Sequence, residues 1–150
     1  MNEVNPYLYF DGNAREALEH YKSVFGGDFA VVLRFRDMGG GPPGTPEADL
    51  DRIAHMALPF GKGSMLMASD TLPSMKMKVN VGNNFYIALS PETSDEADRL
   101  FAGLSRGGKV EMPLQQTAWA EKHGSCTDRF GVQWMFTYTG KVEFSPPKPS

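Results

Sequence analysis

The stretch Asn5-Pro-Tyr-Leu-Tyr-Phe10 leads into Asn13-Ala-Arg-Glu-Ala-Leu-Glu-His-Tyr-Lys-Ser-Val-Phe-Gly-Gly27, and a similar run follows later in the chain. There, Asn84-Phe-Tyr-Ile-Ala-Leu89 leads into a second helical pattern that ends at Arg106-Gly-Gly108. The apolar helix positions correspond at a spacing of about eighty residues, which is the mark of an internal repeat. Two copies indicate two half-modules that pair their sheets. A concave surface between such halves is the natural place for a ligand.

Each copy predicts one strand, one helix and then three strands. In the first copy, Asn13 three residues before Glu16 indicates a capping box, and Gly26-Gly27 ends the helix. The helix is amphipathic, with apolar residues at helical spacing. The strands predicted for this copy are 5–10, 29–35, 53–60 and 64–70, the last two joined by a hairpin turn at 61–63. Residues 38–49 are rich in Gly and Pro and are expected to form a mobile loop.

The second copy repeats this order. Thr93 or Ser94 is expected to cap its helix, and Gly107-Gly108 to end it. The predicted strands are 85–89, 109–117, 120–130 and 132–138. Residues 72–83 form a connector, and residues 139–150 a polar tail. We therefore expect one α+β domain over residues 1–150, with module one at about 5–70 and module two at about 84–138.

Composition favours an ordinary globular protein, with 41% apolar and 22% charged residues. The net charge of −3 gives no electrostatic case for nucleic-acid binding. No apolar run is long enough to span a bilayer, and no signal peptide is visible. The single cysteine, Cys126, excludes an internal disulfide, and these features together favour a cytoplasmic protein.

These stretches resemble the vicinal oxygen chelate superfamily, most closely its PhnB-like branch, which is related to glyoxalase and bleomycin-resistance proteins. The similar segments extend over residues 5–138 and include Tyr21-Lys-Ser-Val-Phe-Gly-Gly27, His55-Met-Ala-Leu58, Leu66-Met-Ala-Ser-Asp70 and Thr127-Asp-Arg-Phe-Gly-Val-Gln-Trp134. The resemblance implies two βαβββ modules that form a cupped mixed sheet with the helices outside. It also implies a homodimer, and exposed strand edges favour the same state.

In this superfamily, metal ligands come from the first and fourth strand of each module. Carried over by the resemblance, these positions are Pro6, Met67, Tyr86 and Met135. None is an ordinary ligand for Mg, Mn, Zn or Fe, because thioether sulfur prefers soft ions such as Cu(I). We therefore expect no metal and no other cofactor. Some PhnB-like sequences are labelled ubiquinone-pathway methyltransferases, but this chain lacks a strand-to-helix glycine loop for a nucleotide-like cofactor.

Period-two alternation separates two faces of each predicted strand. We assign Tyr7, Tyr9, Phe85, Ile87, Trp134 and Phe136 to the face that packs on the helices. The cup then carries Pro6, Leu8, Met67, Tyr86, Ala88, Gln133 and Met135. Met and aromatic side chains accept flat or apolar ligands, although each of these residues can equally be core.

Three further residues complete the candidate site. His55 is expected on the cup face as a polar anchor or general base, or as a hydrogen-bonded core histidine. Trp119 is expected at the cup mouth, or else in the core or a dimer interface. Cys126 requires a nearby base to act as a nucleophile, and alternation along the strand points His123 to the opposite face. The predicted ligand-binding residues are therefore His55, Met67, Tyr86, Trp119 and Met135.

Three functions remain open at this point. The first is a metal-free protein that binds a small apolar or aromatic molecule. The second is a metal-dependent lyase or dioxygenase with a displaced metal site near His55. The third is a structural dimer without a ligand. Whether the protein is an enzyme, which residues would be catalytic and which ligand it binds do not follow from the sequence.

Overall fold

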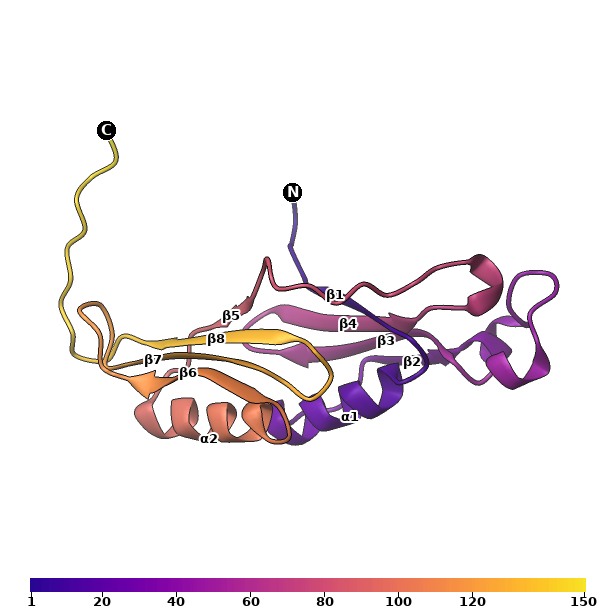
Figure 1. The fold of residues 1–150 in the computed structure, drawn as a ribbon, viewed down its shortest axis with the longest axis horizontal. Helices are drawn as coiled ribbons and strands as arrows, with labels where there is room; N and C mark the ends of the chain where they lie inside the picture. The colour runs from indigo at the N-terminus through magenta and orange to yellow at the C-terminus, as the bar shows by residue number, and fades with distance from the viewer. The chain divides into compact units, whose positions relative to one another are not determined.

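The computed structural model describes residues 1–150, which form two compact units, Met1–Asn80 and Val81–Ser150. Each unit holds one helix and four strands in the same order (Figure 1). The elements of the first unit are β1 (Tyr7–Phe10), α1 (Ala14–Phe25), β2 (Val31–Arg34), β3 (Ile53–Phe60) and β4 (Ser64–Asp70). Those of the second are β5 (Ile87–Leu89), α2 (Ser94–Ser105), β6 (Lys109–Gln115), β7 (Lys122–Thr127) and β8 (Gln133–Tyr138). The predicted α+β fold of two βαβββ modules is confirmed.

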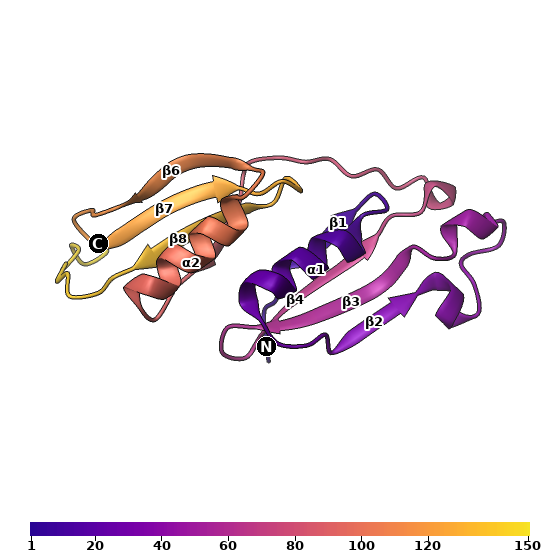
Figure 2. The same ribbon diagram turned by 90° about the horizontal axis from the view of Figure 1, so that it is seen from below.

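The two sheets have the same topology, which confirms the repeat at the level of strand pairing. Their strand orders are β1-β4-β3-β2 and β5-β8-β7-β6. In each sheet the first strand pairs parallel with the last, and the other pairs are antiparallel, so both sheets are mixed. Within each unit the helix lies along one face of its own sheet (Figure 2). The opposite face of each sheet, called here the open face, has no helix of its own unit over it.

Packing between helix and sheet supplies the core of each unit. In the first unit, α1 buries Ala17, Leu18, Tyr21 and Val24 against the side of the sheet that carries Met56, Leu58 and Leu66. In the second, α2 buries Ala97, Leu100 and Leu104, and Phe101 packs edge-on against Phe136 with ring centroids 5.2 Å apart. Each fully buried Leu or Met stabilises the fold by about 1.5–3 kcal/mol.

The face assignment for the first strand was wrong. Leu8 and Phe10 are buried on the helix side, whereas Tyr7 and Tyr9 are 40% and 51% exposed. Tyr7 lies directly beside Met67, which shares the open face. Every residue from Tyr7 to Phe10 is apolar or aromatic, so alternation alone carries no signal for which set is inward. Pairing with β4 decides it.

In the second unit the assignment is confirmed for β8. Trp134 and Phe136 are fully buried, and Ile87 pairs with Trp134 on the same side. Ala88 and Met135 pair on the open face. Phe85 is the exception, because it precedes β5 and is 64% exposed, so it does not pack on the helix.

In each unit a buried aspartate accepts hydrogen bonds from the backbone of a connecting segment. Asp70, at the end of β4, accepts hydrogen bonds from the backbone N–H groups of Gly12 (3.0 Å), Ala14 (2.9 Å) and Ile53 (2.8 Å). The predicted capping box at Asn13 is therefore wrong, because Asn13 makes no side-chain cap and Asp70 takes that place. Thr93 does cap α2, by accepting from the N–H of Glu96 at 3.0 Å.

In the second unit a similar structural role falls to Asp128, which follows β7. It accepts from the N–H groups of Phe130 and Val132 and from Nε1 of Trp134, at 2.8–3.0 Å. Gly131 completes the turn at φ 88, a backbone conformation that favours glycine. Asp128 to Gly131 therefore form a tight turn that leads directly into β8.

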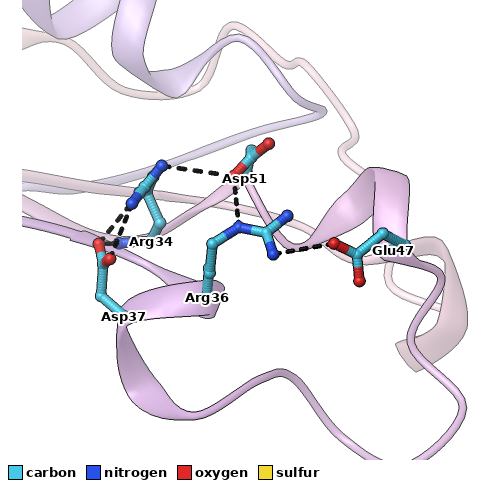
Figure 3. A network of polar contacts seen from close by, with 5 residues as sticks. All are labelled: Arg34, Arg36, Asp37, Glu47 and Asp51. Carbon is cyan, nitrogen blue, oxygen red and sulfur yellow. Dashed lines mark hydrogen bonds and ion pairs between the residues drawn. The ribbon is translucent and has the colours of Figure 1, made fainter.

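The segment after β2 is more structured than expected from its Gly and Pro content. Residues Phe35–Met38 and Glu47–Asp49 form short 3-10 helices within the region predicted as a loop. Five charged side chains connect this region to the start of β3 (Figure 3). Arg34 pairs with Asp37 and Asp51, and Arg36 pairs with Asp51 and Glu47, at 2.8–3.4 Å. These ion pairs link the two short helices to the residues just before β3.

Several predicted strands are shorter in the structure. The predicted strand at 29–35 is Val31–Arg34, and the one at 120–130 is Lys122–Thr127. The hairpin turn at 61–63 joins β3 and β4 as expected. Neither helix has the length and apolar character that crossing a bilayer requires.

Candidate functional site

The open face of the first unit gathers aromatic, thioether and imidazole groups. His55, on β3, lies with Nδ1 3.0 Å from the hydroxyl of Tyr7 on β1. The two rings are also stacked, with centroids 5.6 Å apart. This pairing holds the imidazole in a defined orientation, because both the ring plane and one ring nitrogen have a partner.

The surroundings of His55 combine an apolar surface with one polar group. Met67 is half-buried beside Tyr7, and Tyr9 lies against Tyr7 with ring centroids 5.4 Å apart. Aromatic rings and thioethers provide an adaptable contact surface, and imidazole provides a hydrogen bond. His55 and Met67 therefore lie on one face of one sheet, as predicted, and Tyr7 joins them.

Tyr86 and Met135 lie on the open face of the second unit. The two side chains lie along one surface and do not face each other. Met135 pairs with Ala88 on the adjacent strand, and Tyr86 lies two residues before Ala88, so both side chains belong to one surface. Their separation along that surface is about two residues of strand, or roughly 7 Å.

Tyr86 is fixed at one end of this surface by polar contacts. Its hydroxyl donates to Oε2 of Glu111 at 2.9 Å, and this hydrogen bond raises the pKa of the Tyr86 hydroxyl. The side chain of Gln133 is buried. With its amide oxygen turned toward Tyr86, it accepts from the same hydroxyl at 3.0 Å, and its amide nitrogen donates to the carbonyls of Gly82 and Phe85. The hydroxyl proton can serve only one of the two acceptors at a time.

Trp119 and His123 lie near the start of β7, away from Thr127 at its end. The Trp119 ring meets the His123 ring edge-on at a centroid distance of 5.4 Å, and Nδ1 of His123 lies 3.0 Å from Oγ1 of Thr137. Trp119 is 44% exposed, so it is not a core residue of its unit. The open face of the second unit is therefore more polar than the sequence indicated, since it also carries Ser125 and Thr127.

Cys126 has the environment of a structural residue. It is fully buried, pairs with Trp134 on the helix side, and lies on the face opposite His123, as alternation predicted. Burial, with the charges of Asp128 and Glu111, raises the pKa of its thiol to about 12. A thiol in this state is a poor nucleophile at neutral pH.

The residues at the superfamily's metal positions do not suit its usual metals. Met67 and Met135 occupy open-face positions on β4 and β8, and the β1 residue beside Met67 is Tyr7, not Pro6 as we had carried over. No group of three or more His, Cys, Asp and Glu side chains is arranged to hold a metal ion. Thioether and phenol groups are poor donors for Mg, Mn, Zn or Fe.

Comparison with known proteins identifies the family. The family model described as 3-demethylubiquinone-9 3-methyltransferase matches residues 2–137. Protein YjdN of Escherichia coli K12 is 34% identical over 140 residues, which cover 88% of this chain and 92% of YjdN. The crystal structure of protein PA1353 from Pseudomonas aeruginosa is 38% identical with a TM-score of 0.79, over 92% of this chain and 98% of that one.

Two more distant structures agree in fold. A PhnB protein from Bacillus cereus has a TM-score of 0.72 at 24% identity, over 91% of this chain and 99% of its own. A glyoxylase/bleomycin resistance protein/dioxygenase domain from Frankia sp. has a TM-score of 0.64 at 11% identity, over 93% and 98%. The fold is that of the vicinal oxygen chelate superfamily. The chain belongs to its PhnB-like branch, the family that carries the demethylubiquinone methyltransferase description.

Two residues of these open faces escaped the sequence analysis. Tyr7 was assigned to the wrong face, and its partner His55 is 48 residues away in the chain. Glu111 lies within the strand predicted over 109–117 and was not singled out as a site residue. A carboxylate between Val110 and Met112 was the available signal, because a charged residue inside an apolar strand marks a face that is not core.

Proposed function

We propose that this protein binds a small apolar or aromatic molecule on its open sheet faces, without a metal ion. The observation that carries the proposal is the surface around His55. Tyr7, Tyr9 and Met67 leave aromatic and thioether groups accessible beside an imidazole whose orientation is fixed. A monomeric surface seldom exposes such groups together without a binding role.

The polar anchor in this proposal is His55. With Nδ1 facing the Tyr7 hydroxyl, Nε2 is the ring nitrogen that remains to meet a ligand. The ligand's flat body would lie on Tyr7 and Tyr9, and Met67 would adapt to its outline. Met135 and Trp119 offer similar contacts on the second unit. The single buried thiol agrees with a reducing compartment, and we propose a cytoplasmic location.

The methyltransferase description of the family receives no support from the strand-to-helix turns. An anionic cofactor group commonly binds the N–H groups at a helix N-terminus. In the first unit the Asp70 carboxylate already accepts from the N–H of Ala14 at the start of α1. In the second, Thr93 occupies the start of α2. We therefore favour binding over methyl transfer.

A thermal-shift screen of apolar and aromatic compounds tests the proposal on the full chain. A ligand selective for the native state raises the melting temperature by mass action. Met67→Glu should abolish the response of compounds that bind the open face of the first unit, and Met135→Glu that of compounds on the second, because an unpaired charge in an apolar contact is costly. Ala102→Glu, on the exposed side of α2, is the control that should respond as wild type does. If no compound shifts the wild type, or both methionine variants respond normally, the proposal fails.

The two alternatives give different results in the same experiments. A metal-dependent lyase or dioxygenase requires about one Zn, Mn, Fe or Ni per purified chain, lost in His55→Ala, whereas we expect no stoichiometric metal by elemental analysis. A structural dimer without a ligand requires that Met67→Glu or Met135→Glu weaken dimerisation, and that no compound raise the melting temperature of the wild type.

A further inference from the structure

The open face of the second unit ends in a carboxylate that none of the functions above uses. Glu111, on β6, is exposed, yet both of its oxygens are held in place. Oε2 accepts from the Tyr86 hydroxyl at 2.9 Å and Oε1 accepts from Oγ1 of Thr127 at 3.2 Å. Each oxygen keeps one further lone pair, so the group can accept two more hydrogen bonds.

Strand order shows how this group is built. The sheet runs β5-β8-β7-β6, so Tyr86 and Glu111 come from its opposite edges. For their side chains to meet, they must cross the open face above Gln133 on β8 and Thr127 on β7. Tyr86 and Glu111 therefore lie across one end of the open face, and this pair is called here the end wall. Met135 and Ser125, which pair across the strands, form the next row of the same face.

The carboxylate has no cationic partner. No lysine or arginine forms an ion pair with Glu111, and Lys109, two residues earlier on β6, is exposed and makes none. Some other exposed carboxylates, such as Asp37 and Asp51, are paired with arginines. A fixed, unpaired carboxylate beside an aromatic ring is complementary to a cation that carries an apolar body.

We propose that this end wall binds the ammonium group of a small aromatic or apolar amine. The ammonium would donate to the free lone pairs of Glu111 and lie against the Tyr86 ring, and the apolar body would extend over Met135. This inference rests on the proposed function for the apolar body, and adds the charge of the ligand.

Three probes with one aromatic body test the charge preference on the full chain. They are 2-phenylethylammonium, the neutral 2-phenylethanol and the anionic 3-phenylpropionate, each titrated by calorimetry or ligand-observed NMR. The ammonium should bind tightest. Its affinity should fall when salt is raised from about 0.05 M to about 0.5 M, because salt screens exposed charges, while that of the alcohol should not.

Glu111→Gln is the decisive variant, since it keeps the side-chain shape and one acceptor oxygen, turns the other position into an N–H donor that a hydroxyl can accept, and removes the charge. It should weaken ammonium binding by about 10- to 100-fold, the range for a hydrogen bond to a charged group, and leave the alcohol unchanged. Glu143→Gln, an exposed carboxylate in the tail, should bind all three as wild type does. An unchanged melting temperature shows that Glu111→Gln is folded.

Several outcomes would overturn the inference. They are equal binding of ammonium and alcohol, tighter binding of the carboxylate, an ammonium preference that survives Glu111→Gln, or no binding of any probe. The compound screen judges the proposed function separately. If apolar compounds stabilise the protein and respond to the methionine variants while the ammonium gains nothing, the proposed function stands and only the charge assignment falls.

Discussion

At the scale of single residues, two buried carboxylates satisfy N–H groups that apolar side chains could not. Asp70 and Asp128 are each less than 6% exposed, and each accepts three N–H donors. Buried charges are tolerated only where such donors satisfy them. Both residues hold a connecting turn against the end of a sheet, so each sets the start of the element that follows.

Replacing Asp70 by Asn should destabilise the protein by about 3 kcal/mol, because an amide presents N–H groups where the backbone also presents N–H groups. Denaturant unfolding followed by circular dichroism measures the change. Asp95→Asn, an exposed carboxylate on α2, is the matched control and should alter stability by less than about 0.5 kcal/mol. A loss for Asp70→Asn as small as that of the control would show that Asp70 is not a structural anchor.

At the scale of elements, the two helices begin by different means. α2 uses the side chain of Thr93, immediately before its first residue, whereas α1 uses Asp70 from the end of β4. A local cap and a tertiary cap satisfy the same unpaired N–H groups. Only the local one is visible as a sequence pattern.

Alanine at the two N-cap positions should separate these mechanisms. Thr93→Ala should cost about 1 kcal/mol of unfolding free energy, the usual value for a lost N-cap. Asn13→Ala should cost only a few tenths, since its side chain makes no cap hydrogen bond. Equal losses for the two variants, measured by denaturant titration, would contradict this account.

The charged network of Figure 3 lies in the segment between β2 and β3 and should respond to pH. Hydrogen bonds from Arg34 lower the pKa of Asp37 from 3.8 to about 2, and a hydrogen bond from Arg36 lowers that of Asp51. A carboxyl group whose pKa is lowered in the folded state stabilises that state above its unfolded pKa. The contribution is lost as the pH falls through the folded value.

The backbone and Nε NMR signals of Arg34 should therefore stay constant down to about pH 4 and change mainly below about pH 3. The global melting temperature should respond little to this step, because the groups are exposed and surface ion pairs contribute modestly. The Asp37→Asn variant should lack the transition. A wild-type midpoint at the ordinary aspartate pKa of 3.8 would show that the pairing is absent in solution.

At the scale of the whole molecule, the strand edges favour self-association. The outermost strands are β1 and β2 in one sheet and β5 and β6 in the other. β2 exposes Val31 and Val32, at 38% and 36%, on a strand with an unpaired edge. Proteins commonly cover or blunt such edges.

We expect a homodimer in solution. Multi-angle light scattering at micromolar concentration should give twice the mass of one chain, and sedimentation equilibrium should show the same species. Arg99→Gln, on the exposed side of α2, should leave the mass unchanged. A monomer mass in both measurements would contradict the expectation.

The sequence by itself determined the repeat, the order of elements and most of the helix-packed core. These features follow from periodicity, since Ala17, Tyr21 and Val24 recur at helical spacing and match Ala97, Phe101 and Leu104 in the second copy. Turn chemistry is equally local, as the Thr93 cap and the Asp128 to Gly131 turn show. Features that depend only on residues close together in the sequence can be predicted from the sequence.

Only the tertiary structure decided which face of β1 is open and which groups meet there. Tyr7 and Leu8 are equally suited to burial, and the register with β4 selects Leu8 for the core and leaves Tyr7 beside His55. Asp70 caps a helix that begins 56 residues earlier. Glu111 meets Tyr86 across the width of a sheet. Each of these contacts joins residues far apart in sequence, and their pairing depends on strand register, which short strands that are apolar on both faces do not specify locally.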